Sequence, residues 1–269
     1  MTTAFAEYRF DNRALRDLVR SAWSASYEAA AAGMPGVIAP DAHVEFVFQT
    51  GAPSGLSSHP EAATPRAMIF ALRRGVLSLT PSGANRIVAF RVAPAVASVI
   101  LKRSLVDCWN RAVPLADLIG SEADRLLEQV AHTPQAGIGA LLESWLNARL
   151  TDWNADDRRN LRLQNALFWD VVHEPLSTLA DDIGVTVRTL RRHCERYAGL
   201  SPKQVTMSGR ILRACVTLRT HRDVSIAGVA DGIGFNDQAA FTNAFRHYVG
   251  MTPAKFRAEP VVFCEGVSS

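Results

Sequence analysis

The stretch from Leu176 to Arg257 contains the same pattern twice, and this repeat restricts the fold more than any other feature of the 269-residue chain. The first copy has its landmarks at Leu176, Ala180, Ile183, Gly184, Leu190, Cys194, Tyr197, Gly199 and Pro202. The second copy has them at Ile226, Ala230, Ile233, Gly234, Phe241, Phe245, Tyr248, Gly250 and Pro253. Matched residues lie 50 apart before the turn and 51 apart after it, so the second copy contains one extra residue beside its turn.

Each copy has the pattern of a short helix, a turn and a longer helix. The small side chains of Ala180 and Ala230 allow two helices to cross closely, and Gly184 and Gly234 can adopt the positive φ of a sharp turn. In each longer helix the apolar residues recur at i, i+4 and i+7, which predicts one buried stripe. The sequence therefore predicts two helix-turn-helix units, with longer helices over 187–197 and 237–248.

The faces opposite these stripes carry side chains that suit DNA. Arginine can bind guanine O6 and N7 with two hydrogen bonds, glutamine and asparagine suit adenine, and hydroxyls and helix-start N–H groups suit phosphates. Glu195 and Asp237 would repel phosphate, so they are expected to order a neighbouring arginine or to cap a helix. A long helix over 204–220, joining the copies, would set the distance between the recognition helices, which is roughly 34 Å if both enter successive major-groove faces.

The last hundred residues resemble the arabinose-regulator (AraC/XylS) family of bacterial transcription regulators. The motifs that carry the resemblance are Leu179-Ala180, Gly184 to Thr186, Gly199 to Lys203, Arg210-x-x-Arg213-Ala214, Gly234 to Gln238, and Gly250 to Arg257. The resemblance implies sequence-specific binding to double-stranded promoter DNA. The candidate DNA-contacting residues are Thr186, Arg188, Thr189, Arg191, Arg192, Asn236, Gln238, Ala239, Thr242, Asn243 and Arg246. Family members often carry a basic residue where Asn243 stands, so the second unit either reads bases or mainly holds the DNA backbone.

The charge and composition of the chain agree with DNA as a partner. Residues 161–258 contain 13 Lys or Arg against 8 Asp or Glu, whereas the rest contains 16 against 18. The C-terminal part thus has the sign that DNA attracts. No apolar run reaches the roughly 18 residues of a membrane helix, no secretory signal begins the chain, and the four cysteines form no Cys-x-x-Cys pair. We therefore expect a cytoplasmic protein with reduced thiols.

The N-terminal half reads as a mixed segment. A helix is expected over 13–32, an exposed loop over 51–65, and short strands over 37–48, 67–72, 76–80 and 87–92. On the first strand Val44, Phe46 and Phe48 would share one face. This half resembles, through the segments 40–45, 90–94 and 113–120, the small β-barrel (cupin-like) sensory domain of one branch of the same family. The predicted fold class is α+β, with this barrel and flanking helices followed by an all-α domain.

Two helices are expected after the barrel, over 121–132 and 139–150, with Ser121 as N-cap of the first. They would either pair two subunits or pack on their own barrel. A polar break over 151–157 suggests a boundary, giving a sensory or dimerisation domain at 1–153, a DNA-binding domain at 154–258 and a tail at 259–269. A further helix is expected over 160–173.

The expected function is a DNA-binding transcription regulator controlled by a small-molecule effector in the N-terminal domain. The alternative is a constitutive regulator whose N-terminal half only dimerises or interacts. Trp23, Phe46, Phe48, Phe70, Phe90 and Trp109 are the aromatic residues that would line a pocket or fill a solid core. RNA polymerase is an expected partner of an activator, and a homodimer stays open. No catalytic residue, metal site or cofactor is expected, because phosphate-binding loops and nucleophile elbows are missing and His43-x-Glu45 finds no third ligand at convincing spacing.

Overall fold

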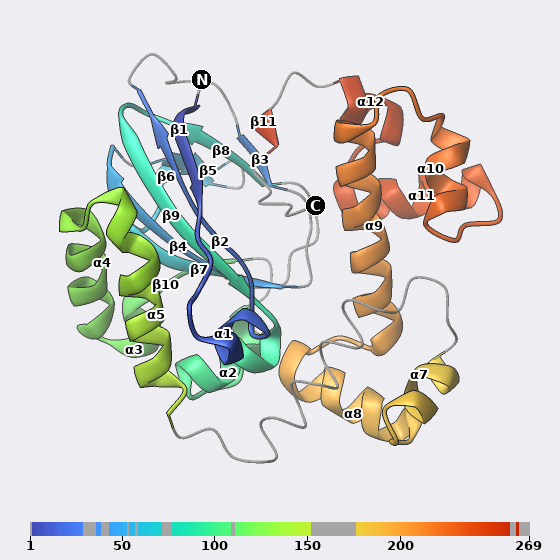
Figure 1. The fold of residues 1–269 in the computed structure, drawn as a ribbon. Helices are drawn as coiled ribbons and strands as arrows, with labels where there is room; N and C mark the ends of the chain where they lie inside the picture. Colours follow the sequence, from blue (N-terminus) through green and yellow to red (C-terminus); the bar gives the residue numbers. More distant parts are fainter. Residues whose placement is uncertain are drawn as a thin grey trace.

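A computed structural model describes residues 2–28, 36–38, 43–52, 54–56, 59–71, 77–108, 111–151, 176–258 and 262–263. Its N-terminal part combines two β-sheets with helices, and its C-terminal part is helical (Figure 1). The fold is therefore α+β. The predicted helix over 160–173 and the predicted boundary between residues 153 and 154 lie outside the described residues.

The larger sheet has six strands in the spatial order β1-β2-β9-β4-β7-β10, and every pair is antiparallel. Its strands are β1 (Thr2–Glu7), β2 (Val19–Tyr27), β4 (Val44–Gly51), β7 (Ala67–Ala71), β9 (Asn85–Val92) and β10 (Ala112–Pro114). The face predicted for Val44, Phe46 and Phe48 is confirmed, since all three are fully buried in one cluster. The opposite face of the sheet is also buried, in a second apolar cluster. Its members are Trp23, Ala25, Val47, Met68, Phe70, Ile87 and Ala89.

The smaller sheet has the order β11-β3-β8-β5-β6. Its strands are β3 (Gly36–Ile38), β5 (Ser54–Leu56), β6 (His59–Ala63), β8 (Leu77–Pro81) and β11 (Val262–Phe263). The sheets meet at a corner where Gly51, with φ 129°, approaches the backbone so closely that a Cβ would lie 2.6 Å from the carbonyl oxygen of Ala84. Only glycine fits this corner without displacing the backbone. The domain is thus a two-sheet form of the expected barrel, with β1 and β10 as edges of the larger sheet.

Three expectations for this half were wrong. The predicted helix over 13–32 is one short turn, α1 (Arg13–Arg16), followed by strand β2, because pairing with both β1 and β9 outweighs the helical preference of an alanine-rich segment. The predicted loop over 51–65 contains β5 and β6, and Ser54 is buried. The predicted strand over 37–48 is two strands, β3 and β4, in different sheets.

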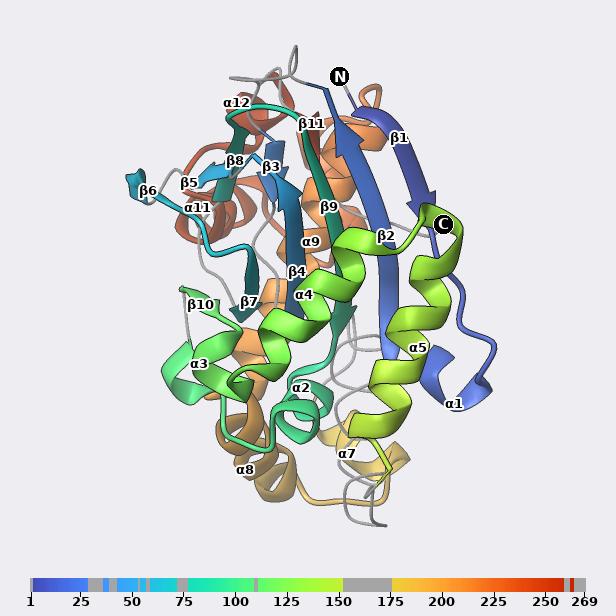
Figure 2. The same cartoon turned by 90° about the vertical axis from the view of Figure 1, so that its left-hand side faces the viewer.

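Helices cover the outer face of the larger sheet (Figure 2). They are α2 (Pro94–Leu101), α3 (Ala116–Ile119), α4 (Glu122–His132) and α5 (Ile138–Arg149), with the 3₁₀ turns η2 (Val106–Cys108) and η3 (Gln135–Gly137). The apolar stripes of α4 and α5 belong to the same buried cluster as Phe46 and Phe90. Of the two roles considered for these helices, packing on their own sheet is the one observed.

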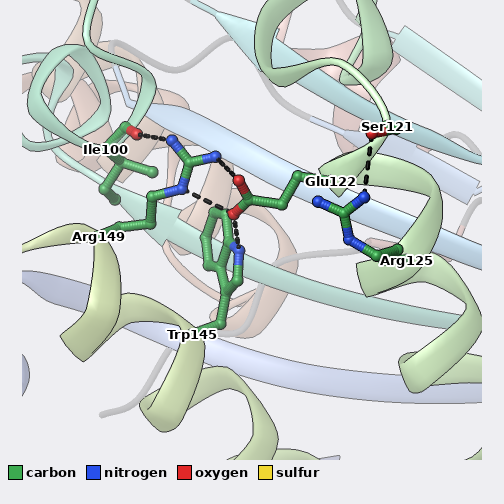
Figure 3. A network of polar contacts seen from close by, with 6 residues as sticks. All are labelled: Ile100, Ser121, Glu122, Arg125, Trp145 and Arg149. Carbon is green, nitrogen blue, oxygen red and sulfur yellow. Dashed lines mark hydrogen bonds and ion pairs between the residues drawn. The ribbon is translucent and has the colours of Figure 1, made fainter.

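A polar network ties α4, α5 and α2 together (Figure 3). The Glu122 carboxylate accepts hydrogen bonds from the Trp145 indole N–H at 2.9 Å and from Nε and Nη2 of Arg149, and Arg149 Nη1 donates to the carbonyl oxygen of Ile100. Burial alone would raise the pKa of Glu122, but these donors and the arginine charge lower it. The expected side-chain cap at Ser121 was wrong, since its hydroxyl accepts from Arg125 instead.

Six helices form the described C-terminal part: α7 (Leu176–Asp182), α8 (Val187–Ala198), α9 (Pro202–Thr220), α10 (Ile226–Gly232), α11 (Gln238–Val249) and α12 (Pro253–Ala258). The predicted long connecting helix is α9, which begins at a capping box between Ser201 and Gln204. At 19 residues it is about 28 Å long. Separate apolar clusters fill the α7–α8 and α10–α11 units.

Among the described residues, the two parts contact each other through a helix and through a strand. Helix α8 packs against α2 and η2, and strand β11 pairs in parallel with β3 through Val262↔Gly36 and Phe263↔Val37. The tail, which carries no recognisable sequence signal, thus adds an edge strand to the smaller sheet (Figure 1).

Candidate nucleic-acid interface

The two helix-turn-helix copies share two backbone hydrogen bonds in their turns. The N–H of Gly184 donates to Asp181 O and that of Val185 to Ala180 O, and the bonds Gly234→Asp231 and Phe235→Ala230 repeat them 50 residues later. Gly184 has φ 66° and Gly234 has φ 76°, as the sequence predicts. The repeat in the sequence is therefore a repeat in backbone structure.

The copies differ at the start of their longer helices. Helix α8 is capped by Thr186, whose Oγ1 accepts from the N–H of Thr189, whereas α11 is capped by Asp237, whose carboxylate accepts from the N–H groups of Ala239 and Ala240. These caps lie 51 residues apart, so the additional residue of the second copy enters between Gly234 and its cap. The predicted capping role of Asp237 is confirmed, and the two backbone donors hold its pKa below its usual range.

The predicted apolar stripes hold the recognition helices in place. Leu190 and Cys194 of α8, and Phe241, Phe245 and Tyr248 of α11, are all buried. Burial raises the pKa of the Cys194 thiol to about 12, with the charge of Glu195 adding to the effect. Cys194 is therefore a protonated core residue at neutral pH, as the sequence indicates.

Most candidate DNA-contacting side chains lie on the outside of these helices. Four candidates from the first unit and four from the second are exposed: Thr186, Arg188, Arg191 and Arg192, and Gln238, Ala239, Asn243 and Arg246. Asn236 is exposed in the loop before α11, and Thr189 and Thr242 are half-buried at the edges of their faces. Each recognition helix thus presents one continuous polar face.

Hydrogen bonds at the helix starts already engage some of the groups that could bind DNA. The backbone N–H of Ala239 already donates to Asp237 at 3.0 Å, and the hydroxyls of Thr186 and Thr189 lie 3.0 Å apart. Ala239 therefore presents its methyl group, which suits apolar contact with a thymine methyl rather than a phosphate. By contrast, the guanidinium of Arg196 on α8 lies 5.4 Å from the ring centre of Tyr197 in the same helix.

Arg210 of α9 fixes the second turn, a role that the sequence reasoning missed. Its Nε donates to Ile233 O at 2.6 Å, its Nη2 donates to Gly234 O, and its guanidinium lies 4.5 Å from the ring centre of Phe235. The position stands out in the sequence only as the first arginine of the Arg210-x-x-Arg213 motif. The contact couples the long helix directly to the turn that positions α11.

Comparisons with known proteins identify the same region. A model for a helix-turn-helix domain matches residues 179–259. The transcriptional activator RhaS of Escherichia fergusonii is 31% identical over 106 residues, which is 38% of this chain and 38% of that protein. The probable transcription factor PqrA of Proteus vulgaris is 33% identical over 82 residues, covering 30% of this chain and 66% of PqrA. The DNA-binding domain of AdpA, solved in complex with a target DNA, is 32% identical over 36% of this chain and 89% of that domain, with a TM-score of 0.33.

The C-terminal part of the chain, residues 179–259, carries a helix-turn-helix domain of the AraC/XylS type. The chain spans less than half the length of the first curated relatives that it matches, and these matches cover its C-terminal region. The AraC/XylS signature that closes the second unit has a visible structural basis. Phe256 is buried against Phe245 and beneath the Arg219 guanidinium, and Arg257 donates to Val224 O at 2.7 Å.

A second candidate site lies on the inner face of the larger sheet. Arg91 and Glu45, opposite each other on β9 and β4, form a buried ion pair at 3.3 Å. Ser21 and Trp23 follow on β2, and the Ser21 Oγ and Trp23 Nε1 atoms are buried without a hydrogen-bond partner among the described residues. Ala89 lies opposite Trp23 on β2 and opposite Val47 on β4, and its side chain is only a methyl group.

The aromatic residues named in the sequence divide between the two faces. Phe46, Phe48 and Phe90 stack under the helices, with the rings of Phe46 and Phe90 4.5 Å apart, so they fill solid core. Trp23 and Phe70 are on the inner face. Trp109 lies outside the described residues. Among the described residues, no group of His, Cys, Asp and Glu is arranged to hold a metal, and no helix is long and apolar enough to cross a membrane.

Proposed function

We propose that the protein is a sequence-specific DNA-binding transcription regulator that reads duplex DNA with α8 and α11. The observation that carries the proposal is the pair of similar turns, each followed by a helix with an exposed polar face, joined by the single helix α9. Arg188, Arg191 and Arg192 would bind guanine edges or phosphates, and Gln238 and Asn243 would bind adenine. The remaining candidates would hold the backbone: Thr186, Thr189, Asn236, Thr242 and Arg246.

Selection of bound duplexes from a random DNA library, with the full chain at near-physiological salt, tests this function. The expected result is a motif of two blocks about one helical turn apart, at least one of them containing guanine. Strongly salt-dependent binding with no enriched motif would instead mean attraction to any DNA and would contradict the proposal.

We also propose that a small-molecule effector binds the inner face of the larger sheet. Buried polar groups without partners are costly, and a ligand oxygen beside Trp23 Nε1 and Ser21 Oγ would satisfy both. Because Glu45 already neutralises Arg91, an uncharged ligand with a carbonyl or hydroxyl group and an apolar body fits better than an anion. Such a ligand regulates only if it binds two states of the protein with different affinity.

A thermal-shift screen of neutral carbonyl and hydroxyl compounds separates this proposal from a constitutive regulator. A ligand on the inner face should raise the melting temperature, and Trp23→Phe, which keeps the ring and removes the N–H donor, should weaken that rise. If no compound alters melting in the parent chain, the N-terminal half is better described as an interaction module.

Further partners follow from the same proposal. An activator of this kind would contact RNA polymerase, and a homodimer would place repeated motif copies in its target. A regulator of promoter DNA would act in the cytoplasm. We propose no catalytic role, consistent with the transcription regulators among its relatives and with the raised pKa values of Cys108 and Cys194, which make both thiols poor nucleophiles.

A further inference from the structure

Helix α2 lies between the helices of the N-terminal domain and the first recognition helix (Figures 1 and 2). It contacts α5 and it contacts α8. Seven of its eight residues are buried, and the remaining one, Val99, is half-buried. A helix that is apolar and buried all round has no solvent face along which it could slide. Because protein interiors are close-packed, a shift of α2 must be taken up by the helices packed against it, α8 among them.

Arg149 of α5 binds the C-terminal end of α2. The last carbonyl groups of a helix have no partner within the helix. In α2 the carbonyls of Ser98 and Val99 accept from the backbone N–H of Lys102. The carbonyl of Ile100 accepts from Arg149 Nη1 at 3.3 Å. The arginine also places a positive charge at the negative end of the α2 dipole, so it stabilises this helix end in two ways.

Arg149 is itself fixed by α4 and by a neighbour in its own helix (Figure 3). The Glu122 carboxylate accepts from Arg149 Nε at 2.8 Å and from Nη2, and the guanidinium lies 5.7 Å from the ring centre of Trp145. The Trp145 ring in turn lies against Phe46 and Phe90 of the larger sheet, with ring centres 6.2 and 6.1 Å away. Through Arg149, the end of α2 is therefore connected to α4, to α5 and to the sheet.

We propose that Arg149 is a positioning residue through which the N-terminal domain fixes the recognition helix α8. Arg149 holds α2 in place, and α2 holds α8 by packing. The inference deepens the proposed function, on which its regulatory meaning rests, because it names the route from the N-terminal domain to a helix that reads DNA. Helix α11 has no such link to α2 among the larger contacts of the described residues, so the effect should be confined to the first unit.

Hydrogen–deuterium exchange of the full chain, followed by mass spectrometry of peptides from α2, α8 and α11, tests this route. Arg149→Met keeps the length of the side chain and removes its hydrogen bonds and charge. Arg149→Lys keeps the charge and one donor group. Val130→Ala is the matched control, since it removes buried methyl groups from α4 and leaves every hydrogen bond of Arg149 in place.

We expect the amides of α2 and α8 to exchange several-fold faster in Arg149→Met than in the parent chain, with α11 unchanged. Arg149→Lys should show a smaller increase in both helices, and Val130→Ala should leave α8 at the parent rate. Parent-like exchange of α8 in Arg149→Met would overturn the inference. Equal acceleration of α8 and α11, or equal acceleration of α8 in Val130→Ala, would overturn it too, since either result means a general loss of stability.

This experiment uses no DNA, so it is decided separately from the proposed function. A negative exchange result leaves DNA reading by α8 and α11 in place. A parent chain that selects no DNA motif contradicts the proposed function without changing the exchange rates.

Discussion

Single residues decide how the two copies differ. Thr186 caps the N-terminus of α8 with a neutral hydroxyl, whereas Asp237 caps the N-terminus of α11 with a carboxylate. A helix N-terminus is the end that would approach a phosphate. The first copy carries three exposed arginines on its polar face, and the corresponding face of the second carries Gln238 and Asn243. Because arginine suits guanine whereas glutamine and asparagine suit adenine, we expect the first unit to prefer guanine and the second adenine.

Arg192 should specify one position of the DNA motif. Arg192→Ala is expected to weaken binding to the selected duplex by about tenfold and to abolish the preference at one base pair, because a bidentate contact to guanine is worth about 1–3 kcal/mol. Arg192→Lys keeps the positive charge but cannot form two parallel hydrogen bonds to guanine. This variant should therefore lose the preference for guanine while keeping more of the DNA affinity than Arg192→Ala. Competition with duplexes changed at each position measures both effects, and an unchanged preference in Arg192→Ala would exclude Arg192 as a base contact.

Asp237 should make the stability of α11 depend on pH. Its folded-state pKa lies below that of an unfolded chain, about 3.9, so the cap stabilises the helix above that pH and is lost as pH falls through the folded pKa. Asp237→Ala should lower the melting temperature at pH 7. Asp237→Asn, also a good cap, should melt close to the parent at pH 7 and remove this acid-dependent loss. Equal melting of all three variants at pH 7 would show that the cap contributes nothing.

Whole elements were predictable where their signal is local. Both turns and the apolar stripes of α8 and α11 follow from residues close together in the sequence, and the structure confirms them. The DNA contacts of the candidate residues on α8 and α11 stay predictions, although the faces that carry these residues are exposed. Helix α2 was missed despite a usable signal, a proline at its first turn followed by an apolar run.

Other elements depend on partners distant in the chain. Strand β2 forms because β1 and β9 flank it, and its alanine-rich sequence alone favours a helix. Strand β11 is two residues long and exists only through β3. The contact of α8 with α2 has no recognisable signal in the sequence. No pattern within a short stretch of sequence encodes such pairings.

The pairing of α4 with α5 should depend on Arg149. Arg149→Met keeps the length of the side chain but removes three hydrogen bonds and leaves Glu122 without its charged donor, so the free energy of unfolding should fall by about 1–2 kcal/mol. Urea denaturation measures the loss. Arg125→Met, which removes the contact with the exposed Ser121 hydroxyl and a smaller charge effect on Glu122, should cost clearly less. Equal effects of the two substitutions would contradict a structural role of the network.

At the scale of the molecule, two parts with separate cores are joined by small contacts. The clusters of the N-terminal sheets and those of the α7–α12 region share no residue. The larger contacts between the parts that the structure describes are α8 with α2 and η2, and β11 with β3. We therefore expect the two parts to behave as two domains.

The C-terminal domain should fold without the rest of the chain. A fragment of residues 154–269 is expected to be helical, to unfold cooperatively and to select the same DNA motif as the full chain, because its apolar clusters are self-contained. Circular dichroism and library selection check these outcomes. An unfolded fragment would show that contacts with the N-terminal domain are needed and that the boundary near residue 153 is wrong.

The central claim is that α8 and α11 read one duplex together at a spacing set by α9. The most direct measurement is the affinity for the selected duplex after five base pairs, about half a turn, are inserted between its two blocks. Because α9 is one continuous helix and Arg210 ties it to the second turn, the units cannot follow that rotation, and affinity should fall to that of a duplex with one block. Unchanged affinity after the insertion would mean that the two units do not bind DNA as one rigid pair, which would contradict the account.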